Sequence, residues 1–341
     1  MAGLLDDMRV LDLSAWRPMP HATQILADLG AEVLKVEPPG GDPMRAYPEI
    51  FASVARGKRS IVLDLGTHAG RSRARELAAQ AGVVCESWRP GVADRLGVGY
   101  REVAPSNPAV IYCSLSGYGQ EGPLRSSPGH DLNFQALAGA VAPRHEDEHD
   151  PETPRLPVAD LEGGTVCALL ICAAWARRVV SNTGQRIDVA MADVVAWWVG
   201  TRSGTTHEGS DTPTFGSPGY GVFRTLDDQW IALGVLSEQR LWDATCRALG
   251  LDDLAGLDFG VRLARTEELN SMLGTEIARI DRDSALARFE AVGAPATAVL
   301  RPEEATRHPH FLARDIHVRT DAGLVAALPA SLAGDGRTVS G

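Results

Sequence analysis

The chain has 341 residues, more than one average domain, so we expect two domains or one large domain with an insertion. Apolar residues make up 44% and charged residues 23%, with both signs interspersed, which is typical of a folded globular protein and excludes a disordered one. The net charge of −11 argues against a general affinity for nucleic acid or an anionic membrane surface, although a local basic pocket is compatible with it.

The ends and the apolar runs of the chain predict a cytoplasmic location. The first residues, MAGLLDDMRVLDL, lack the cationic start and the cleavage site of a secretory signal. The longest apolar run, Val166 to Ala176, is shorter than a bilayer span, so we expect no membrane insertion. The five cysteines are odd in number and scattered, which predicts reduced core residues. No Cys/His spacing is typical of a metal site, so no metal is expected.

Strands and helices alternate through the first part of the chain. Residues 8–13 read as a buried strand, 21–30 as an amphipathic helix and 31–37 as the next strand. The same pattern repeats as a strand over 60–65, a helix over 70–82, and strands over 83–87 and 109–116. This alternation predicts an α/β fold with a mostly parallel sheet and helices on both faces. Ligands of such sheets bind beyond the carboxyl ends of the strands, where the loops WRPMP, PPGGDPMR, WRPGV and SGYGQEGP are expected.

The second half of the chain predicts a smaller domain. A long helix over about 163–179 and a strand and helix in SNTGQRIDVAMADVVAWW complete the first part. The stretch after Gly200 is rich in Gly, Ser, Thr and Pro, which predicts a linker. Residues 220–236 read as a hairpin that turns at Asp227-Asp228, followed by two or three helices to about Gly293. From Val325 onward small residues dominate without a strong pattern, so this tail is expected to fray.

One glycine motif has an ambiguous meaning. GYGQEG, residues 117–122, fits the spacing G-x-G-x-x-G and follows a predicted strand, as in a dinucleotide site. Pro123 and the following LRSSPG disfavour the helix that such a site requires, and the first strand-to-helix turn, SAWRPMPH, contains no glycine. We therefore interpret these glycines as permitting a tight loop close to a ligand.

Two side chains are candidates for chemistry. His130, in SPGHDLNFQALAG, either starts a helix or transfers protons, because imidazole titrates near neutral pH. We expect Asp131 to cap that helix and His130 to face the ligand. Asp160 precedes Leu-Glu-Gly-Gly and an apolar helix, so it is either a helix N-cap or a reactive carboxylate. In the second interpretation, Gly163 and Gly164 let a substrate approach the backbone.

A series of segments in a fixed order supports a more specific hypothesis. They run from about residue 8 to 317 and include ILADLGAEVLKVEPPGGDPMR, WRPGVADRLGVGY, NPAVIYCSLSGYGQEGP, GHDLNFQALAG, LPVADLEGG, TGQRIDVAMAD and YGVFRTLDDQWIALG. The series resembles the family III CoA transferases, the CaiB/BaiF group, which also contains the 2-methylacyl-CoA racemases. The resemblance implies a Rossmann-like large domain (1–200, with a C-terminal return over 305–341), a linker (201–219), a small α+β domain (220–304) and two chains interlocked as a homodimer.

The same resemblance implies an acyl-CoA thioester as substrate, with coenzyme A entering as part of it and no permanently bound cofactor. The family's CoA-binding positions fall on Lys35, Glu37, Pro38, Arg59 and Arg89, with Gly117, Tyr118 and Gly119 near the thioester. Arginine and lysine suit the phosphates of CoA. Arg17 stands where the family has glutamine or a small residue, so it either binds a substrate carboxylate or pairs with a CoA phosphate.

In the resembled family, the position of Asp160 acts in every active member. In transferases the carboxylate attacks the acyl-CoA carbonyl and forms an aspartyl anhydride. In racemases a base and an acid remove and return the proton alpha to the thioester. The sequence Gly129-His130-Asp131 resembles the racemase branch. It favours epimerisation of a 2-methylacyl-CoA through His130 and Asp160, with Glu238 of the partner chain pairing with the histidine. A CoA transferase with Asp160 as nucleophile, and a CoA-binding homologue without catalysis, remain as alternatives.

Overall fold

The computed structural model describes residues 3–141, 151–203 and 217–330. The contacts divide the chain into two units, one formed by residues 1–201 with 309–341 and the other by residues 202–308. The predicted linker, 201–219, lies mostly in the segment 204–216, which is outside the described residues. Each unit is therefore considered by itself.

The first unit is built on a six-stranded sheet in the order β3-β2-β1-β4-β5-β6, in which every pair of neighbours is parallel. The strands are β1 (Arg9–Asp12), β2 (Glu32–Glu37), β3 (Arg59–Val62), β4 (Val83–Glu86), β5 (Ile111–Ser116) and β6 (Gln185–Ala190). Every residue of the central strands β4 and β5 is buried, as expected for a parallel sheet covered on both faces. The predicted α/β fold with a mostly parallel sheet is confirmed.

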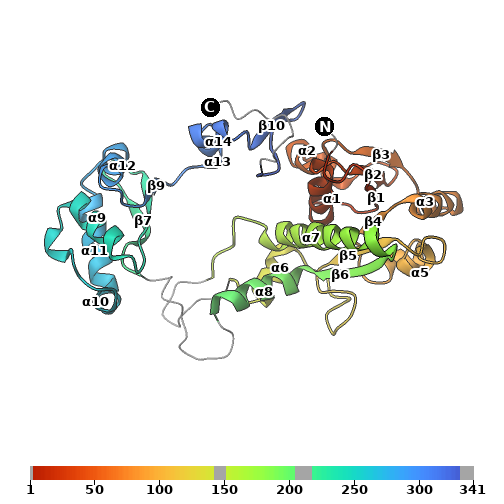
Figure 1. Ribbon diagram of the computed structural model, residues 1–341, viewed down its shortest axis with the longest axis horizontal. Coiled ribbons are helices and arrows are strands. Elements are labelled where there is room, and N and C mark those ends of the chain that lie inside the picture. Colours follow the sequence, from red (N-terminus) through yellow and green to blue (C-terminus); the bar gives the residue numbers. More distant parts are fainter. Residues whose placement is uncertain (1–2, 142–150, 204–216, 331–341) are drawn as a thin grey trace. The chain divides into compact units, whose positions relative to one another are not determined.

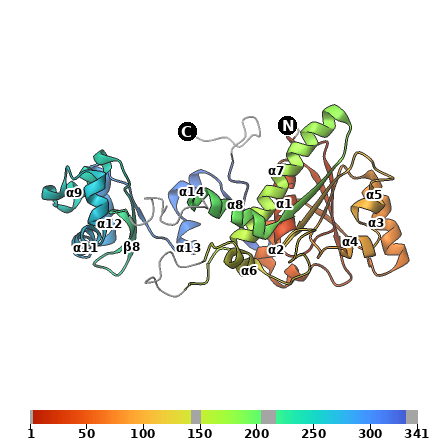
Figure 2. The same ribbon diagram turned by 90° about the horizontal axis from the view of Figure 1, so that it is seen from below.

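Helices cover both faces of this sheet (Figures 1 and 2). On one face, α1 (Pro18–Asp28) and α7 (Val158–Ser181) pack against each other and share a core with β1, β4, β5 and β6. On the other face, α3 (His68–Gln80) and α5 (Tyr100–Val103) enclose a second core. The other helices of this part of the chain are η1 (Pro43–Ala46), α2 (Pro48–Ala55), α4 (Val92–Arg95), α6 (Asp131–Leu137) and α8 (Met191–Ser203).

Helix α7 begins earlier than the sequence pattern predicted. Its first residue is Val158 and its N-cap is Pro157, so Asp160 lies inside the first turn and the N-cap interpretation of Asp160 is wrong. With 24 residues, α7 is also long and apolar enough to cross a membrane by length and composition alone, contrary to the prediction from the apolar run. Core helices of soluble proteins can have the same length and apolar composition. One face of α7 is buried against α1 and the sheet.

The two glycines after Asp160 serve packing. A Cβ atom at Gly164 would lie 2.5 Å from the carbonyl oxygen of Pro18 in α1, and one at Gly163 would lie 2.9 Å from the side chain of Met191. The absence of a side chain at Gly164 lets the backbones of α1 and α7 approach closely, and its absence at Gly163 leaves room for Met191. The prediction that the glycines admit a substrate is therefore wrong, because other parts of the protein already occupy the space beside them.

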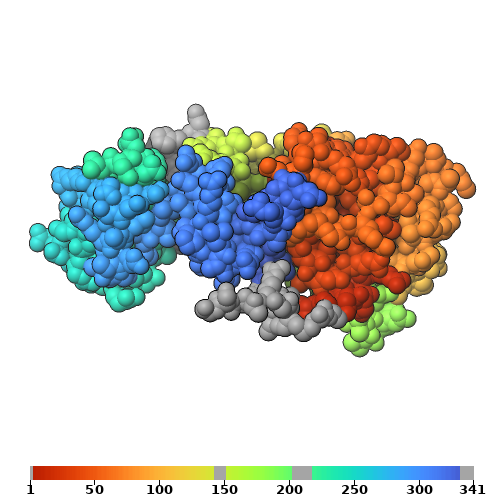
Figure 3. All heavy atoms as spheres, turned by 90° about the horizontal axis from the view of Figure 1, so that it is seen from above, coloured from red at the N-terminus to blue at the C-terminus, as the bar shows by residue number. Residues whose placement is uncertain are grey.

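The C-terminal part of the first unit returns to the N-terminal half. After α14 (Pro309–Ala313), the strands β10 (His317–Thr320) and β11 (Gly323–Ala326) form an antiparallel hairpin that packs on α2. Figure 3 shows this blue segment lying against the red and orange N-terminal elements. Val325 is buried, so the predicted loss of pattern begins later than expected; residues 331–341 lie outside the described residues.

The second unit has its own sheet and core. Its antiparallel strands, in the order β7-β8-β9, are β7 (Tyr220–Arg224), β8 (Trp230–Gly234) and β9 (Ala296–Ala298). Its helices are α9 (Gln239–Leu249), η2 (Asp252–Leu254), α10 (Phe259–Ala264), α11 (Thr266–Ile277), α12 (Arg282–Ala291) and α13 (Pro302–Ala305). The hairpin that turns at Asp227-Asp228 is confirmed, and Asp228 adopts a positive φ of 57° there. The region up to Gly293 contains more helices than the two or three predicted.

Substitution of Gly164 by alanine tests the close approach of α1 and α7. The added methyl group must displace backbone rather than a flexible side chain, so we expect Gly164→Ala to lower the free energy of unfolding by about 1–3 kcal/mol. Urea denaturation of both proteins measures this difference. Thr165→Ala, at the next and exposed position of α7, is the control and should change stability by less than about 0.5 kcal/mol. An equal loss in both variants would contradict this account.

Candidate active site

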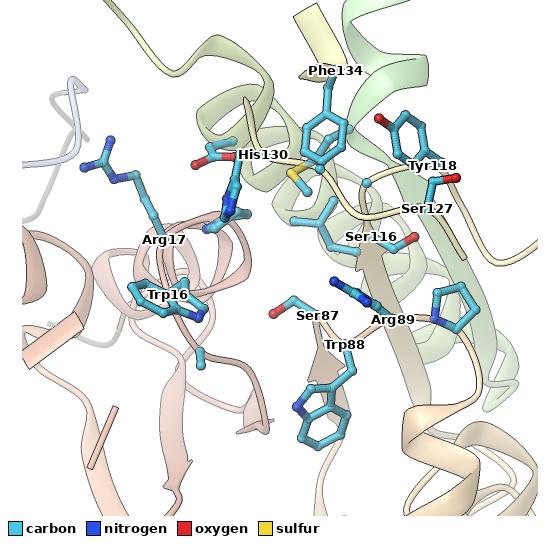
Figure 4. Close-up of a pocket in the computed structure, with 18 of the residues that line it drawn as sticks. Trp16, Arg17, Ser87, Trp88, Arg89, Ser116, Tyr118, Ser127, His130 and Phe134 are labelled. Carbon is cyan, nitrogen blue, oxygen red and sulfur yellow. The ribbon is translucent and has the colours of Figure 1, made fainter. Parts of the chain in front are cut away.

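A cavity of about 520 Å³ lies at the carboxyl ends of the parallel strands. The loops after β1, β4 and β5 form its walls, together with the segment leading into α6 and the first turn of α7 (Figure 4). This is where ligands of open parallel sheets bind. Of the predicted site residues, the cavity brings together Arg17, Arg89, Gly117, Tyr118, His130 and Asp160.

Buried charges fix the loop after β1. Asp12 is fully buried and accepts hydrogen bonds from the backbone N–H of Ser14 (3.0 Å) and the hydroxyl of Thr23 (2.6 Å). The ammonium of Lys58 lies 3.5 Å from the Asp12 carboxylate. Burial alone would raise the pKa of Asp12, but the charges of Lys35 and Lys58 bring it below its usual value. The carboxylate is therefore ionised at neutral pH and ties β1, α1 and the loop together.

This loop presents Trp16 and Arg17 at the cavity. Trp16 has a φ of 66°, which is strained for a bulky residue, and its side chain is 53% exposed. The fixed backbone on either side of Trp16 maintains this conformation. Arg17 is half-buried, and its guanidinium makes no hydrogen bond or ion pair with the described residues. In Figure 4 the Arg17 side chain extends away from Arg89, with His130 between them.

His130 and Asp160 meet where α6 and α7 begin. His130 is the N-cap of α6 by its extended backbone, and the side chain of Asn133 accepts a hydrogen bond from the His130 backbone N–H at 3.0 Å. Asp131, the first residue of α6, accepts a hydrogen bond from the backbone N–H of Asp160 at 3.1 Å. The prediction that Asp131 caps α6 is therefore wrong, because its carboxylate binds the first turn of α7. His130 lines the cavity, as expected.

The carboxyl of Asp160 has an unusual acidity. Burial and, second, the nearby Asp131 carboxylate raise the pKa of Asp160, whereas Arg17 and His130 lower it, and together they bring it to about 6. A carboxyl with this pKa is partly protonated near neutral pH. It can accept and donate a proton within one reaction cycle, as a general acid–base group must.

Lys35 and Glu37 lie behind the cavity and do not line it. The ammonium of Lys35 forms an ion pair with Asp42 at 2.8 Å and donates a hydrogen bond to the carbonyl of Ser14 at 2.8 Å. Glu37 accepts hydrogen bonds from Arg45 at 2.6 and 2.7 Å, which lower the pKa of Glu37 to about 2. Both side chains are buried and hold the loop after β2. Pro38 is exposed at the end of β2, also outside the cavity wall.

Arg59 lies at the opposite edge of the sheet. It is the first residue of β3 and pairs with Glu32, the first residue of β2, so it marks the amino ends of the strands. Arg59, predicted as a CoA-binding residue, therefore lies away from the cavity at the carboxyl ends of the strands. Arg89 follows β4 at the carboxyl edge, is exposed, and lines the cavity.

The glycine-rich loop after β5 forms one side of the cavity. No helix begins between β5 and Asp131, so the arrangement of a dinucleotide site is absent from this segment, as predicted. Gly117 and Tyr118 line the cavity, whereas Gly119 turns the chain with a φ of 82°. A Cβ atom at Gly117 would lie 2.6 Å from the ring of Phe134, which packs edge-to-face on Tyr118. The glycine thus allows α6 to reach the loop.

A second, polar cavity of about 280 Å³ adjoins the first. Arg89 and Arg125 line both cavities, and neither forms an ion pair with the described residues. At the base of the polar cavity, burial raises the pKa of Glu86 to about 7. Ligand loops were predicted here, among them WRPGV, which begins at Trp88. Arg125 and Glu86 were not predicted as site residues, because neither lies in a recognisable motif.

The remaining candidate, Glu238, belongs to the second unit. It is the N-cap of α9, and its carboxylate accepts a hydrogen bond from the backbone N–H of Leu236 at 3.3 Å. Its pairing with His130 stays a prediction. Among the described residues, no group of three or more His, Cys, Asp and Glu side chains could hold a metal ion.

The fold and cavity define an α/β protein with a carboxyl–imidazole site at the carboxyl edge of a parallel sheet. The model of CoA-transferase family III matches residues 5–339, and the chain belongs to this family.

Known members of the family carry out two different reactions. The acetyl-CoA:oxalate CoA-transferase of Acetobacter aceti is 31% identical, over 97% of this chain and 90% of that protein. The succinyl-CoA:mesaconate CoA-transferase of Haloarcula hispanica is 32% identical, over 94% and 86%. The human alpha-methylacyl-CoA racemase is 30% identical, over 96% and 86%. Transferases and racemases are therefore similar to this chain to the same degree.

Solved structures support the same assignment. A CaiB/BaiF family protein from Brucella suis has a TM-score of 0.87 and 26% identity, covering 98% of this chain and 94% of that one. A protein from Mycobacterium tuberculosis has a TM-score of 0.86 and 30% identity, covering 97% and 94%.

The influence of Asp131 on Asp160 can be measured directly. In Asp131→Asn the amide oxygen can still accept the Asp160 backbone N–H, but the negative charge is lost. We expect the pKa of Asp160 to fall from about 6 toward its usual value. Carbon-13 NMR titration of the labelled aspartate carboxyls detects this shift. Glu121→Gln, which changes an exposed loop carboxylate, should leave the Asp160 titration in place; an unshifted Asp160 in Asp131→Asn would disprove the coupling.

Proposed function

We propose that the protein epimerises an acyl-CoA at the carbon alpha to the thioester, with a 2-methylacyl-CoA as substrate. The observation that carries this proposal is that His130 and Asp160 line one cavity although they come from different elements. They are close enough for His130 to lower the pKa of Asp160. Two groups able to exchange protons near neutral pH are what removal and return of an alpha proton require.

The chemistry needs no bond to the protein. One of the two groups removes the alpha proton, and the electron pair of the C–H bond forms an enolate of the thioester. The other group returns a proton to the opposite face of the same carbon, so the thioester C–S bond stays intact. The first turn of α7, where Asp160 lies, is at the positive end of the helix dipole and stabilises the enolate oxygen.

Coenzyme A is bound as part of the substrate. Arg89 and Arg125 line the cavity and form no ion pair within the described part of the chain, so we assign their guanidinium groups to its phosphates. This assignment replaces Lys35, Glu37 and Arg59, whose side chains are occupied by Asp42, Arg45 and Glu32. The absence of a permanently bound cofactor and the cytoplasmic location stay predictions.

A CoA transferase is the second candidate, favoured by the similarity to transferases at 31% and 32% identity. The Asp160 carboxylate would then attack the acyl carbonyl and release CoA thiolate, and an acceptor acid would resolve the anhydride. A pKa of about 6 leaves most of the Asp160 carboxyl ionised at pH 7, so it is compatible with this role too. His130 in the same cavity is what favours the epimerase, because nucleophilic attack by Asp160 does not require a second proton-transfer group.

Deuterium incorporation separates these activities. The protein incubated with a 2-methylacyl-CoA in deuterated water should place deuterium at the alpha carbon, as detected by mass spectrometry. His130→Ala and Asp160→Ala should each lower the epimerisation rate by about 10²–10⁴-fold, while retaining exchange from one substrate hand. His68→Ala, an exposed histidine on α3, is the matched control and should keep full activity.

The alternatives give other results in the same experiment. Absence of exchange, with hydroxylamine capturing an acyl group on Asp160, would establish the transferase. A protein that binds the thioester but shows neither deuterium exchange nor a captured acyl group would be a non-catalytic CoA-binding homologue.

We also propose that the protein works as a homodimer. Apolar side chains are exposed along α7 and α8, namely Leu169, Leu170, Val179, Val180, Trp197 and Trp198. Trp197 is 63% exposed, and large apolar side chains left exposed on two helices are typical of an interaction surface. Light scattering coupled to gel filtration should give twice the chain mass of 36.3 kDa. A monomeric mass at micromolar concentration would refute the dimer.

A further inference from the structure

The carboxyl groups of Asp131 and Asp160 form a pair whose two members have different surroundings. Asp131 opens α6 and Asp160 lies in the first turn of α7, where the two helices contact each other (Figure 1). The Asp131 carboxylate is near enough to raise the pKa of Asp160. Two neighbouring carboxyls lose their protons one after the other, so the surroundings decide which of them keeps its proton longer.

Asp131 receives a hydrogen bond on each of its carboxylate oxygens. Oδ1 accepts the backbone N–H of Asp160 at 3.1 Å, and Oδ2 accepts the side-chain amide Nε2 of Gln135 at 2.6 Å. The carboxyl of Asp160 accepts no hydrogen bond from the residues that the structure describes. A hydrogen bond to a charged carboxylate shifts its ionisation by about 1–2 pH units in favour of the charged form. The negative charge of the pair is therefore more stable on Asp131.

Gln135 is fixed in the position from which it reaches Asp131. It lies one turn further along α6, and it is only 4% exposed. Its Nε2 also donates to the backbone carbonyl of Leu156, just before α7, at 3.3 Å. Both neighbours of this atom are acceptors, which identifies it as the amide nitrogen and not the amide oxygen. Gln135 thus joins the Asp131 carboxylate to the segment that leads into α7.

The other charged groups that face Asp160 do not produce the difference between the two carboxyls. Arg17, on the loop after β1, and His130, at the N-cap of α6, both lower the pKa of Asp160 and so favour its ionised form. Neither makes an ion pair with Asp160 in the described part of the chain. Burial and the Asp131 charge outweigh them, and the donors on Asp131 are what hold that charge in place.

We propose that Gln135 is a positioning residue, which keeps Asp131 as the permanently charged carboxyl of the pair and leaves the exchangeable proton on Asp160. Gln135 does not line the cavity, so it acts through Asp131 and not on the substrate. The inference rests on the proposed epimerase, in which Asp160 gives and takes the proton. It assigns the residue that selects one of two adjacent carboxyls for this task.

Replacement of Gln135 by methionine tests the proposal, because methionine has nearly the same length and no N–H donor. Carbon-13 NMR titration of the full-length protein, with labelled aspartate carboxyls, follows both groups. In the wild-type protein Asp160 should titrate in one step near pH 6, while Asp131 stays ionised over that range. In Gln135→Met the proton should be shared, so both signals should change near pH 6 and Asp160 should acquire a second step at lower pH.

Two further variants separate this role from a loss of packing. Gln135→Lys retains N–H donors for Asp131, so it should restore a single step at Asp160. Asp131→Asn leaves no carboxylate for Gln135 to hold, so adding Gln135→Met to it should not change the Asp160 titration further. The matched control is Gln239→Met, which removes an amide that donates to Asp243 within α9 at 2.7 Å. It should leave the Asp160 titration as it is in the wild-type protein.

Three results would overturn the inference. They are joint titration of Asp131 and Asp160 in the wild-type protein, unchanged titrations in Gln135→Met, and an effect of Gln135→Met that persists in the presence of Asp131→Asn. The titration requires no substrate, so it is independent of the reaction. A shared proton in Gln135→Met, found together with no deuterium exchange by the wild-type protein, would support the role of Gln135 while rejecting the epimerase. Deuterium exchange with unchanged titrations would do the reverse.

Discussion

The site depends on a cluster of buried charges beneath it. Asp12 lies between Lys58 and Lys35, and Lys35 reaches Asp42, so the loops after β1 and β2 are joined through side chains that are almost completely buried. Buried charges are stable only when paired and hydrogen-bonded, which leaves these loops little conformational freedom. The strained backbone of Trp16 and the position of Arg17 follow from this constraint. Removal of one partner would leave the others unpaired in the core, which is why the cluster acts as a unit.

The candidate reactive centre lies where the N-termini of α6 and α7 meet. Asp131 opens α6 and Asp160 lies in the first turn of α7, and the hydrogen bond between them brings two carboxylates together near His130. The helix dipoles and the backbone N–H group favour negative charge there, whereas burial and mutual repulsion of the carboxylates oppose it. The balance leaves Asp160 with a pKa of about 6. The acidity of this group is therefore a property of how α6 and α7 meet and not of either helix alone.

Much of the fold and part of the site could be predicted from the sequence. Apolar periodicity located all six parallel strands, and His130 and Asp160 stood out as polar residues that precede predicted apolar helices. Periodicity does not reveal partners that are distant in sequence, so Glu32 beside Arg59 and Asp42 beside Lys35 could not be foreseen. The same limit applies to Gly163 and Gly164, since the elements that fill the space beside them come from other parts of the chain. Trp88 and Arg125 lie on loops whose meeting point only the folded chain defines.

The contact between α1 and α7 at Gly164 has a consequence for how specificity can change. It joins the backbone of Pro18, next to Arg17, to the helix that carries Asp160, so two backbones set the spacing between position 17 and Asp160. A replacement of the side chain at position 17 leaves this spacing intact. Divergence could thus exchange the half-buried side chain at position 17 while the placement of Asp160 beside it stays unchanged.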